Sequence, residues 1–263
     1  MPIALLLHAH PDDEAFANFG WASDLVAQGY DVHGVIATGG EASELRSTSS
    51  LREARARRIA KYETALDVMG ASGWSWLDSS AAWVDADGGP LVGDASPERL
   101  RQAVERLLEQ VRPEIVLTFA SDGLTGHPDH IAIAEAAVAA ENGAAVPGGV
   151  WGARLAEPDV RAGVDLLRVL APSARIGSGR VRGTCTELIT RNVQASAQNR
   201  KRALDAYHEG LGTGSLESLV RGGEVVGDSI LLRGILEATG WSTERYEVIR
   251  ADHARQPLPG PTA

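Results

Sequence analysis

The chain has 263 residues, of which 44% are hydrophobic and 23% charged, as in a globular protein with one large domain or two small ones. A formal net charge of −10 argues against general binding to nucleic acid or to an anionic membrane surface, because both require clustered Lys and Arg. No window approaches about 18 uninterrupted apolar residues, so we expect no transmembrane helix, and the first residues lack the basic segment of a secretory signal.

The first half of the sequence alternates segments typical of strands and helices. The apolar run IALLL at 3–7 predicts a strand buried on both faces. The following segments predict, in order, a helix at 13–28, a strand at 32–38, a helix at 51–70, a short strand at 74–77, a loop at 81–95, a helix at 96–111, a strand at 114–120 and a helix at 131–141. This alternation predicts an α/β fold with a Rossmann-like, mostly parallel sheet flanked by helices.

The second half carries weaker patterns, which predict a more irregular C-terminal part. We expect a strand at 185–189, a helix at 195–208, a helix at 228–238 and a strand at 244–250. The single cysteine, Cys185, excludes an internal disulfide, and we expect it to be packed in a protein of a reducing, cytoplasmic compartment. No repeat or domain boundary is evident. We therefore expect one domain over 1–254 and a disordered Pro-rich tail at 255–263.

Two polar clusters follow two of the predicted strands: HAHPDDE at 8–14 and GHPDH at 126–130. Ligands of open α/β sheets bind beyond the carboxyl ends of the strands, so the clusters converge if their strands are close in the sheet. Two His and one Asp suit zinc at a catalytic site, where one position stays open for water. A further carboxylate would accept a proton, and a further His would stabilise an oxyanion or protonate a leaving amine. Spacing alone does not say which Asp is ligand and which is base.

The chain resembles the PIG-L / LmbE-like family, the zinc-dependent N-acetylglucosaminyl deacetylases. The resemblance is carried by HAHPDDE, by TGGE at 38–41, by the helix ending in MG at 69–70 and by TGHPDH at 125–130. It covers roughly residues 1–140, and RKRALDAYH at 200–208 looks like a further helix of the family.

The resemblance implies a metal centre and a general base. His10, Asp13 and His130 would bind zinc, although two His and a carboxylate also suit Fe²⁺ or Co²⁺. Asp12 would be the general base that accepts a proton from the attacking water.

Four further residues would complete the site by the same resemblance. His127 would stabilise the oxyanion and protonate the departing amine, with Asp129 orienting it or raising its pKa. Arg58 and Asp78 would contact the substrate. The helix at 51–70 departs from many relatives at Lys61, where they carry glutamate, and this leaves the sugar partner open.

The sequence therefore predicts a zinc-dependent hydrolase that removes the acetyl group from a small N-acetylated amino sugar, giving free amine and acetate. One alternative is a zinc-dependent amidase acting on a thiol conjugate or another non-sugar amide. A second is a non-catalytic sugar- or metal-binding protein, although Asp12 and His127 would then have no purpose. We expect His8 to lie near the site without binding metal, and Glu14 to serve the helix N-terminus. Whether copies of the chain form a homo-oligomer stays open.

Overall fold

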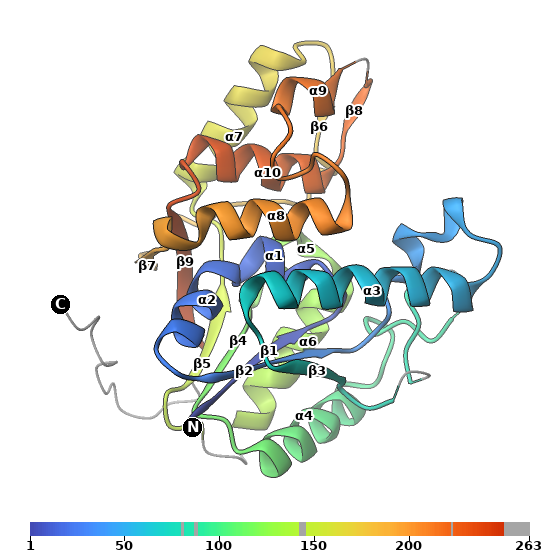
Figure 1. Ribbon diagram of the computed structural model, residues 1–263, viewed down its shortest axis with the longest axis vertical. Helices are drawn as coiled ribbons and strands as arrows, with labels where there is room; N and C mark the ends of the chain where they lie inside the picture. The colour runs from blue at the N-terminus through green and yellow to red at the C-terminus, as the bar shows by residue number, and fades with distance from the viewer. Residues whose placement is uncertain (80–81, 87–88, 142–145, 222, 250–263) are drawn as a thin grey trace.

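The computed structural model describes residues 1–79, 82–86, 89–141, 146–221 and 223–249 (Figure 1). Its strands are β1 (Ile3–His8), β2 (Asp31–Ile36), β3 (Gly73–Trp76), β4 (Ile115–Phe119), β5 (Val150–Ala153), β6 (Arg175–Ile176), β7 (Ile189–Asn192), β8 (Val225–Val226) and β9 (Thr243–Ile249). Its α-helices are α1 (Asp13–Ala17), α2 (Phe19–Ala27), α3 (Leu51–Met69), α4 (Pro97–Val111), α5 (Gly123–Gly126), α6 (Pro128–Glu141), α7 (Glu157–Leu170), α8 (Ala197–Tyr207), α9 (Leu216–Val220) and α10 (Asp228–Ala238).

A seven-stranded sheet in the order β3-β2-β1-β4-β5-β9-β7 organises the molecule. The five strands from β3 to β5 run parallel, and β9 and β7 are antiparallel additions at one side. The predicted mostly parallel α/β sheet is thus confirmed. The chain order reverses between β1 and β4, so the carboxyl ends of these two strands flank the point where open α/β sheets bind ligands.

Helices cover both faces of the sheet. α4 and α6 lie on one face, and α2, α3 and α8 lie on the other (Figure 1). The sequence of β1 is apolar without a break because successive side chains point to opposite faces of the sheet, and helices cover both faces. Ala4 and Leu6 pack into one core, whereas Leu5 and Leu7 pack into the other, and all four are fully buried.

The C-terminal half adds a layer beyond α8, formed by α7, α9, α10 and the two-stranded sheet β6–β8 (Figure 1). β5 and α7 have no counterpart in the sequence predictions. No helix among the described residues is long and apolar enough to cross a membrane. The tail predicted at 255–263 lies outside the described residues.

Three sequence predictions need correction. The strand expected at 185–189 lies instead at Ile189–Asn192, because its pairing with β9 sets its bounds. The helix expected at 13–28 is broken at Asn18, whose φ of −132° is not helical. Cys185 was expected to be packed, and this is wrong, since its loop leaves the thiol exposed.

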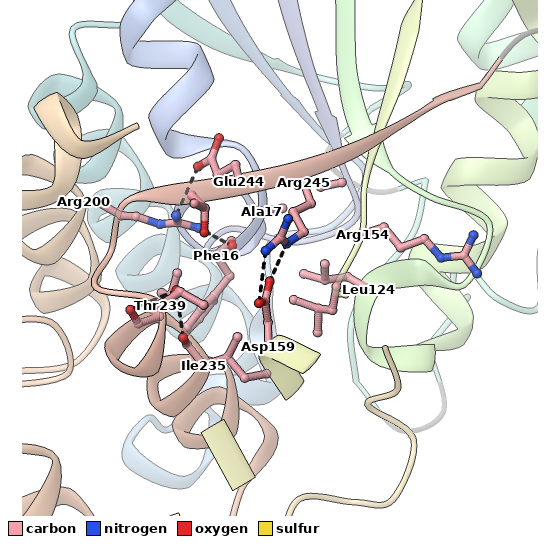
Figure 2. A pocket seen from close by; sticks show the side chains of 14 residues that line it. Phe16, Ala17, Leu124, Arg154, Asp159, Arg200, Ile235, Thr239, Glu244 and Arg245 are labelled. Atoms are coloured by element: carbon pink, nitrogen blue, oxygen red, sulfur yellow. Dashed lines mark hydrogen bonds and ion pairs between the residues drawn. The ribbon is translucent and has the colours of Figure 1, made fainter. Parts of the chain in front are cut away.

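A buried ion pair between two residues of the C-terminal half, Arg200 and Glu244, contacts α1 and α2 on either side of the break at Asn18. Arg200 on α8 donates from Nε to the carbonyl oxygen of Ala15 at 2.8 Å and from Nη2 to that of Phe16. Its Nη1 lies 3.2 Å from Oε1 of Glu244 on β9, and both side chains are at most 2% exposed. Figure 2 shows Arg200 between Glu244 and Phe16, beside a small pocket of about 40 Å³.

The same pair serves both helices at the break. Glu244 accepts hydrogen bonds from the backbone N–H groups of Gly20 at 2.7 Å and Trp21 at 2.9 Å, in the first turn of α2. Helix ends leave such groups without intrahelical partners. Arg200 therefore satisfies carbonyls of α1 while Glu244 satisfies amides of α2, and the pair fixes the angle at which α1 leaves the sheet.

We predict that Arg200→Ala lowers the free energy of unfolding by about 3–5 kcal/mol, because it leaves the Glu244 carboxylate buried without its charge partner. Urea unfolding of the purified protein measures this change. Arg161→Ala is a matched control, since Arg161 pairs with Glu157 on the surface, and it should leave the transition where it is. Equal midpoints for Arg200→Ala and the parent would contradict the role given to the buried pair.

Candidate metal centre and catalytic pocket

The two polar clusters predicted from the sequence meet at the carboxyl ends of β1 and β4. These strands pair in parallel, with Leu6 opposite Leu117. A pocket of about 260 Å³ opens beyond them. The lining includes five of the predicted metal and catalytic residues: His10, Asp12, Asp13, His127 and His130.

Local backbone geometry brings the second cluster into place. Gly123 has φ +63°, and a Cβ there would lie 2.9 Å from Cβ of His130, so only glycine fits without movement. Leu124 follows with φ 60°, a strained value for a residue with a side chain. This tight turn lets α6 begin at Pro128 and directs His130 back toward β1.

Three side-chain donors lie at the spacing that one metal ion requires. Nε2 of His130 lies 3.1 Å from Nδ1 of His10 and 3.2 Å from Oδ1 of Asp13. Nδ1 of His10 lies 3.7 Å from Oδ2 of Asp13. Tetrahedral zinc with bonds of about 2.0–2.1 Å separates neighbouring ligand atoms by about 3.3 Å. His10, Asp13 and His130 therefore fit a single ion with one face left for another ligand.

The second nitrogen of each imidazole supports this arrangement. Nδ1 of His130 lies 2.9 Å from the carbonyl oxygen of Gly123, which places its proton on Nδ1 and leaves Nε2 as the free donor. Nε2 of His10 lies 3.1 Å from Oδ2 of Asp129, which places the proton on Nε2 and leaves Nδ1 free. Both free lone pairs thus belong to the nitrogens that face Asp13.

The pKa values of the clustered side chains favour binding of a cation. Burial acts to raise the pKa of Asp13, but His130 and His10 outweigh it and hold that pKa well below its usual range. Burial acts to lower the pKa of His10, but the hydrogen bond to Asp129 and the charges of Asp13 and Asp85 raise it to about 9. Asp13 is therefore ionised, and a metal ion would compete with a proton on His10.

The geometry also offers other donor combinations. Nitrogens of His10, His127 and His130 all lie within 4.8 Å of one another, and so do ligand atoms of His10, Asp85 and Asp129. His127 is therefore within reach of the same centre. Asp85 lies in the loop predicted at 81–95, which offered no pattern from which its place in the pocket could be predicted.

Asp12 projects into the pocket beside the three donors. Its carboxylate is paired with the guanidinium of Arg58, which also donates from Nε to the carbonyl oxygen of Pro11 at 3.2 Å. Burial raises the pKa of Asp12 above its ordinary value, although Arg58 opposes this. Arg58 is 5% exposed, lies 3.7 Å from Glu44 and lines the pocket, where it pairs with Asp12. Lys61 pairs with the same Glu44.

His127 is a neutral imidazole at pH 7. Burial and the neighbouring His10 and His130 lower its pKa to about 4, although Asp129 acts to raise it. Its Nδ1 accepts the backbone N–H of Asp129 at 3.3 Å, so the proton sits on Nε2. The carboxylate of Asp129 instead contacts His10 and accepts the N–H of Gly93 at 2.7 Å. The Asp129 side chain thus bonds His10, and it acts on His127 through its charge, which acts to raise the pKa of that imidazole.

Asp78 lies apart from the other predicted site residues. It pairs with Arg99 at 3.7 Å and does not line the pocket. The C-terminal half, in contrast, contributes Arg180, Asp228 and Ser229 to the lining. Sequence reasoning missed these three, because only the folded chain brings the start of α10 and the segment after β6, which carries Arg180, to the pocket at the ends of β1 and β4.

The fold and the site together define a Rossmann-like α/β protein with a candidate metal centre at the switch point of its sheet. The model of the PIG-L family, described as GlcNAc-PI de-N-acetylase, matches residues 5–141. The chain therefore belongs to the PIG-L family. This match contains all six residues of the two clusters that we assign to metal binding and catalysis.

Comparison with curated proteins finds deacetylases. The 1D-myo-inositol 2-acetamido-2-deoxy-alpha-D-glucopyranoside deacetylase of Corynebacterium glutamicum (strain R) is 31% identical over 138 residues, which cover 48% of each chain. The chain thus matches about half the length of such relatives.

Comparison with solved structures extends the likeness of fold to nearly the whole chain. N,N'-diacetylchitobiose deacetylase from Pyrococcus horikoshii has a TM-score of 0.58 at 15% identity, covering 94% of this chain and 83% of that one. GalB, the 4-carboxy-2-hydroxymuconate hydratase from Pseudomonas putida, has a TM-score of 0.59 at 14% identity, covering 98% and 100%. A hydratase shares this fold, so the fold alone does not define the reaction.

His8 lies at the end of β1 and is fully buried. Its Nε2 lies 2.7 Å from Oδ1 of Asn18, whose Nδ2 donates to Tyr246 at 3.4 Å, so His8 is the donor in this chain of bonds. Burial lowers the pKa of His8 to about 4.

The buried His8 predicts a specific dependence of stability on pH. The pKa of His8 in the folded chain lies below its unfolded value of 6.5. Between pH 6.5 and 4, His8 is therefore protonated in the unfolded chain but neutral in the folded chain. The contribution of His8 to the free energy of unfolding is therefore greatest above pH 6.5, and it falls by roughly 3 kcal/mol as the pH drops to 4. Urea unfolding of His8→Gln should show a flatter pH profile than the parent. The exposed His208→Gln should keep the parental slope, and parallel profiles for all three proteins would refute the assignment.

Proposed function

We propose that the protein is a zinc-dependent hydrolase that removes the acetyl group from an N-acetylated amino sugar, giving free amine and acetate. The observation that carries this proposal is the set of three donors, His10, Asp13 and His130, at the spacing of one ion, with the Asp12 carboxylate beside them. The names of the curated relatives support an amino-sugar acetamide as substrate. His-rich donor sets with one carboxylate also accept Fe²⁺ or Co²⁺, and zinc is the proposed native ion.

The roles of the chain's residues follow from their protonation. A zinc ion held by His10, Asp13 and His130 would supply Lewis acidity, which polarises a carbonyl and makes a water more acidic. Asp12, with its raised pKa, accepts a proton as the water oxygen bonds to the amide carbon. Arg58 holds the Asp12 carboxylate in place during this transfer.

His127 would act as a hydrogen-bond donor. The amide oxygen becomes negative as the tetrahedral carbon forms. His127 lines the pocket, and its Nε2–H group would donate a hydrogen bond to this oxygen. With a pKa near 4, this imidazole is neutral, which favours hydrogen-bond donation over proton donation. The proton held by Asp12 then passes to the nitrogen as the C–N bond breaks. The acyl carbon leaves as acetate and the nitrogen as the free amine.

Asp12→Ala is the direct test of this assignment. Acetate release from a panel of N-acetyl sugars should fall by about 10²–10⁴-fold, the typical contribution of a general base, with metal content unchanged. Asp13→Ala should lose metal, and Asp67→Ala, an exposed change on α3, should match the parent. Turnover by Asp12→Ala near the parental rate would refute the mechanism.

The same panel decides between the sugar and other amides. An amidase of thiol conjugates would use the same residues, because the pocket wall, not the donor set, selects the group bound to nitrogen. A fully metal-loaded parent that cleaves non-sugar acetamides but no N-acetyl sugar would establish that alternative. Metal binding without turnover on either class would indicate a non-catalytic binding protein.

A further inference from the structure

The backbone of Asp12 is strained. Its φ of 108° and ψ of −21° lie in the left-handed region, which is strained for a residue other than glycine. Such a conformation persists only where its surroundings hold it. The contacts that hold Asp12 therefore also determine where its carboxylate points.

Glu14 and Tyr207 hold the main chain of Asp12. Oε2 of Glu14 accepts the backbone N–H of Asp12 at 3.1 Å, and Oε1 accepts the hydroxyl of Tyr207 at 2.6 Å. Glu14 is fully buried and Tyr207 is 4% exposed. Without the hydroxyl, one carboxylate oxygen of Glu14 would lose its hydrogen-bond donor in a dry environment, and the carboxylate would be free to turn away from Asp12.

Tyr207 also contacts the group that holds the side chain of Asp12. The guanidinium of Arg58 lies over the Tyr207 ring, 4.7 Å from its centroid. Arg58 in turn pairs with the Asp12 carboxylate and bonds the carbonyl of Pro11. One tyrosine thus touches both supports of Asp12, the one on its backbone and the one on its carboxylate.

We propose that Tyr207 is a positioning residue for the general base, acting through Glu14 on the backbone of Asp12 and through Arg58 on its carboxylate. The inference rests on the proposed function, which makes Asp12 the base. Neither Tyr207 nor Glu14 lines the pocket, so their effect is indirect. Tyr207 belongs to α8, outside the residues 5–141 that the family model matches, so the C-terminal half sets the geometry of a base in the N-terminal half.

Tyr207→Phe tests the proposal by removing a single hydroxyl. We expect kcat to fall about ten- to hundredfold, as when a buried polar group is left without its hydrogen-bond partner, with KM within about twofold and metal content unchanged. Tyr246→Phe is the matched control. Its hydroxyl donates to buried Glu244 at 2.7 Å, and it contacts neither Asp12 nor the two groups that hold it. This control should lose comparable thermal stability yet keep kcat within about twofold.

Equal losses of kcat in the two tyrosine variants would show a merely structural role and overturn the proposal. If Tyr207→Phe folds poorly, a comparison of Glu14→Gln with Glu14→Ala tests the same proposal. Glutamine retains an oxygen for the N–H of Asp12, so Glu14→Gln should keep a substantially higher kcat than Glu14→Ala. Equal kcat values for these two variants would also overturn the proposal.

Hydrogen–deuterium exchange gives a readout that needs no substrate. The amide of Asp12 should exchange faster in Tyr207→Phe than in the parent and in Tyr246→Phe, because its acceptor Glu14 is no longer fixed. Parental exchange in Tyr207→Phe overturns the positioning role. A parent that is loaded with metal but releases no acetate overturns the proposed function instead, and the exchange result then still decides whether Tyr207 fixes Asp12.

Discussion

The parallel pairing of β1 with β4 is the constraint on which the candidate site depends. Strands that are far apart in the sequence lie side by side, and each continues past its carboxyl end into a cluster of His and Asp. Each cluster alone has the composition of an ordinary helix start, with an acidic residue near the first turn. Side by side, they bring three donors, two imidazoles and one carboxylate, within one coordination sphere, with the carboxylate of Asp12 beside them.

The site concentrates charge in a region with little access to water. Asp13 is ionised next to two imidazoles, and His10 retains a proton until a cation replaces it. Such a cluster is costly to bury unless every charge has a partner. The backbone carbonyl of Gly123, the carboxylate of Asp129 and the guanidinium of Arg58 supply those partners. The surrounding hydrogen bonds thus define which atoms remain free to bind a metal.

Local patterns were sufficient to predict the centre of the site and the strands that carry it. β1 and β4 are short apolar runs buried on both faces, and the residues that follow them are close in sequence to the strand ends, so their convergence needed only the sheet order. Asp85 could not be predicted, because it lies on a loop without periodicity. The residues from α10 could not be predicted either, because their approach depends on packing between distant helices. The position of Asp78 outside the pocket lining could not be predicted for a related reason, because an irregular loop gives no register by which to place a side chain.

The insertion of β9 into the sheet has a consequence for how the site assembles. β9 is the last strand among the described residues, yet it lies between β5 and β7 and supplies Glu244, whose partner Arg200 holds α1. Contacts of such long sequence separation form late, since the chain must first lose the entropy of closing a large loop. During folding, α1, which carries Asp13, is therefore without its buried brace until β9 has joined the sheet. The helix that carries Asp13 thus reaches its final orientation only when β9 has paired with β5 and β7.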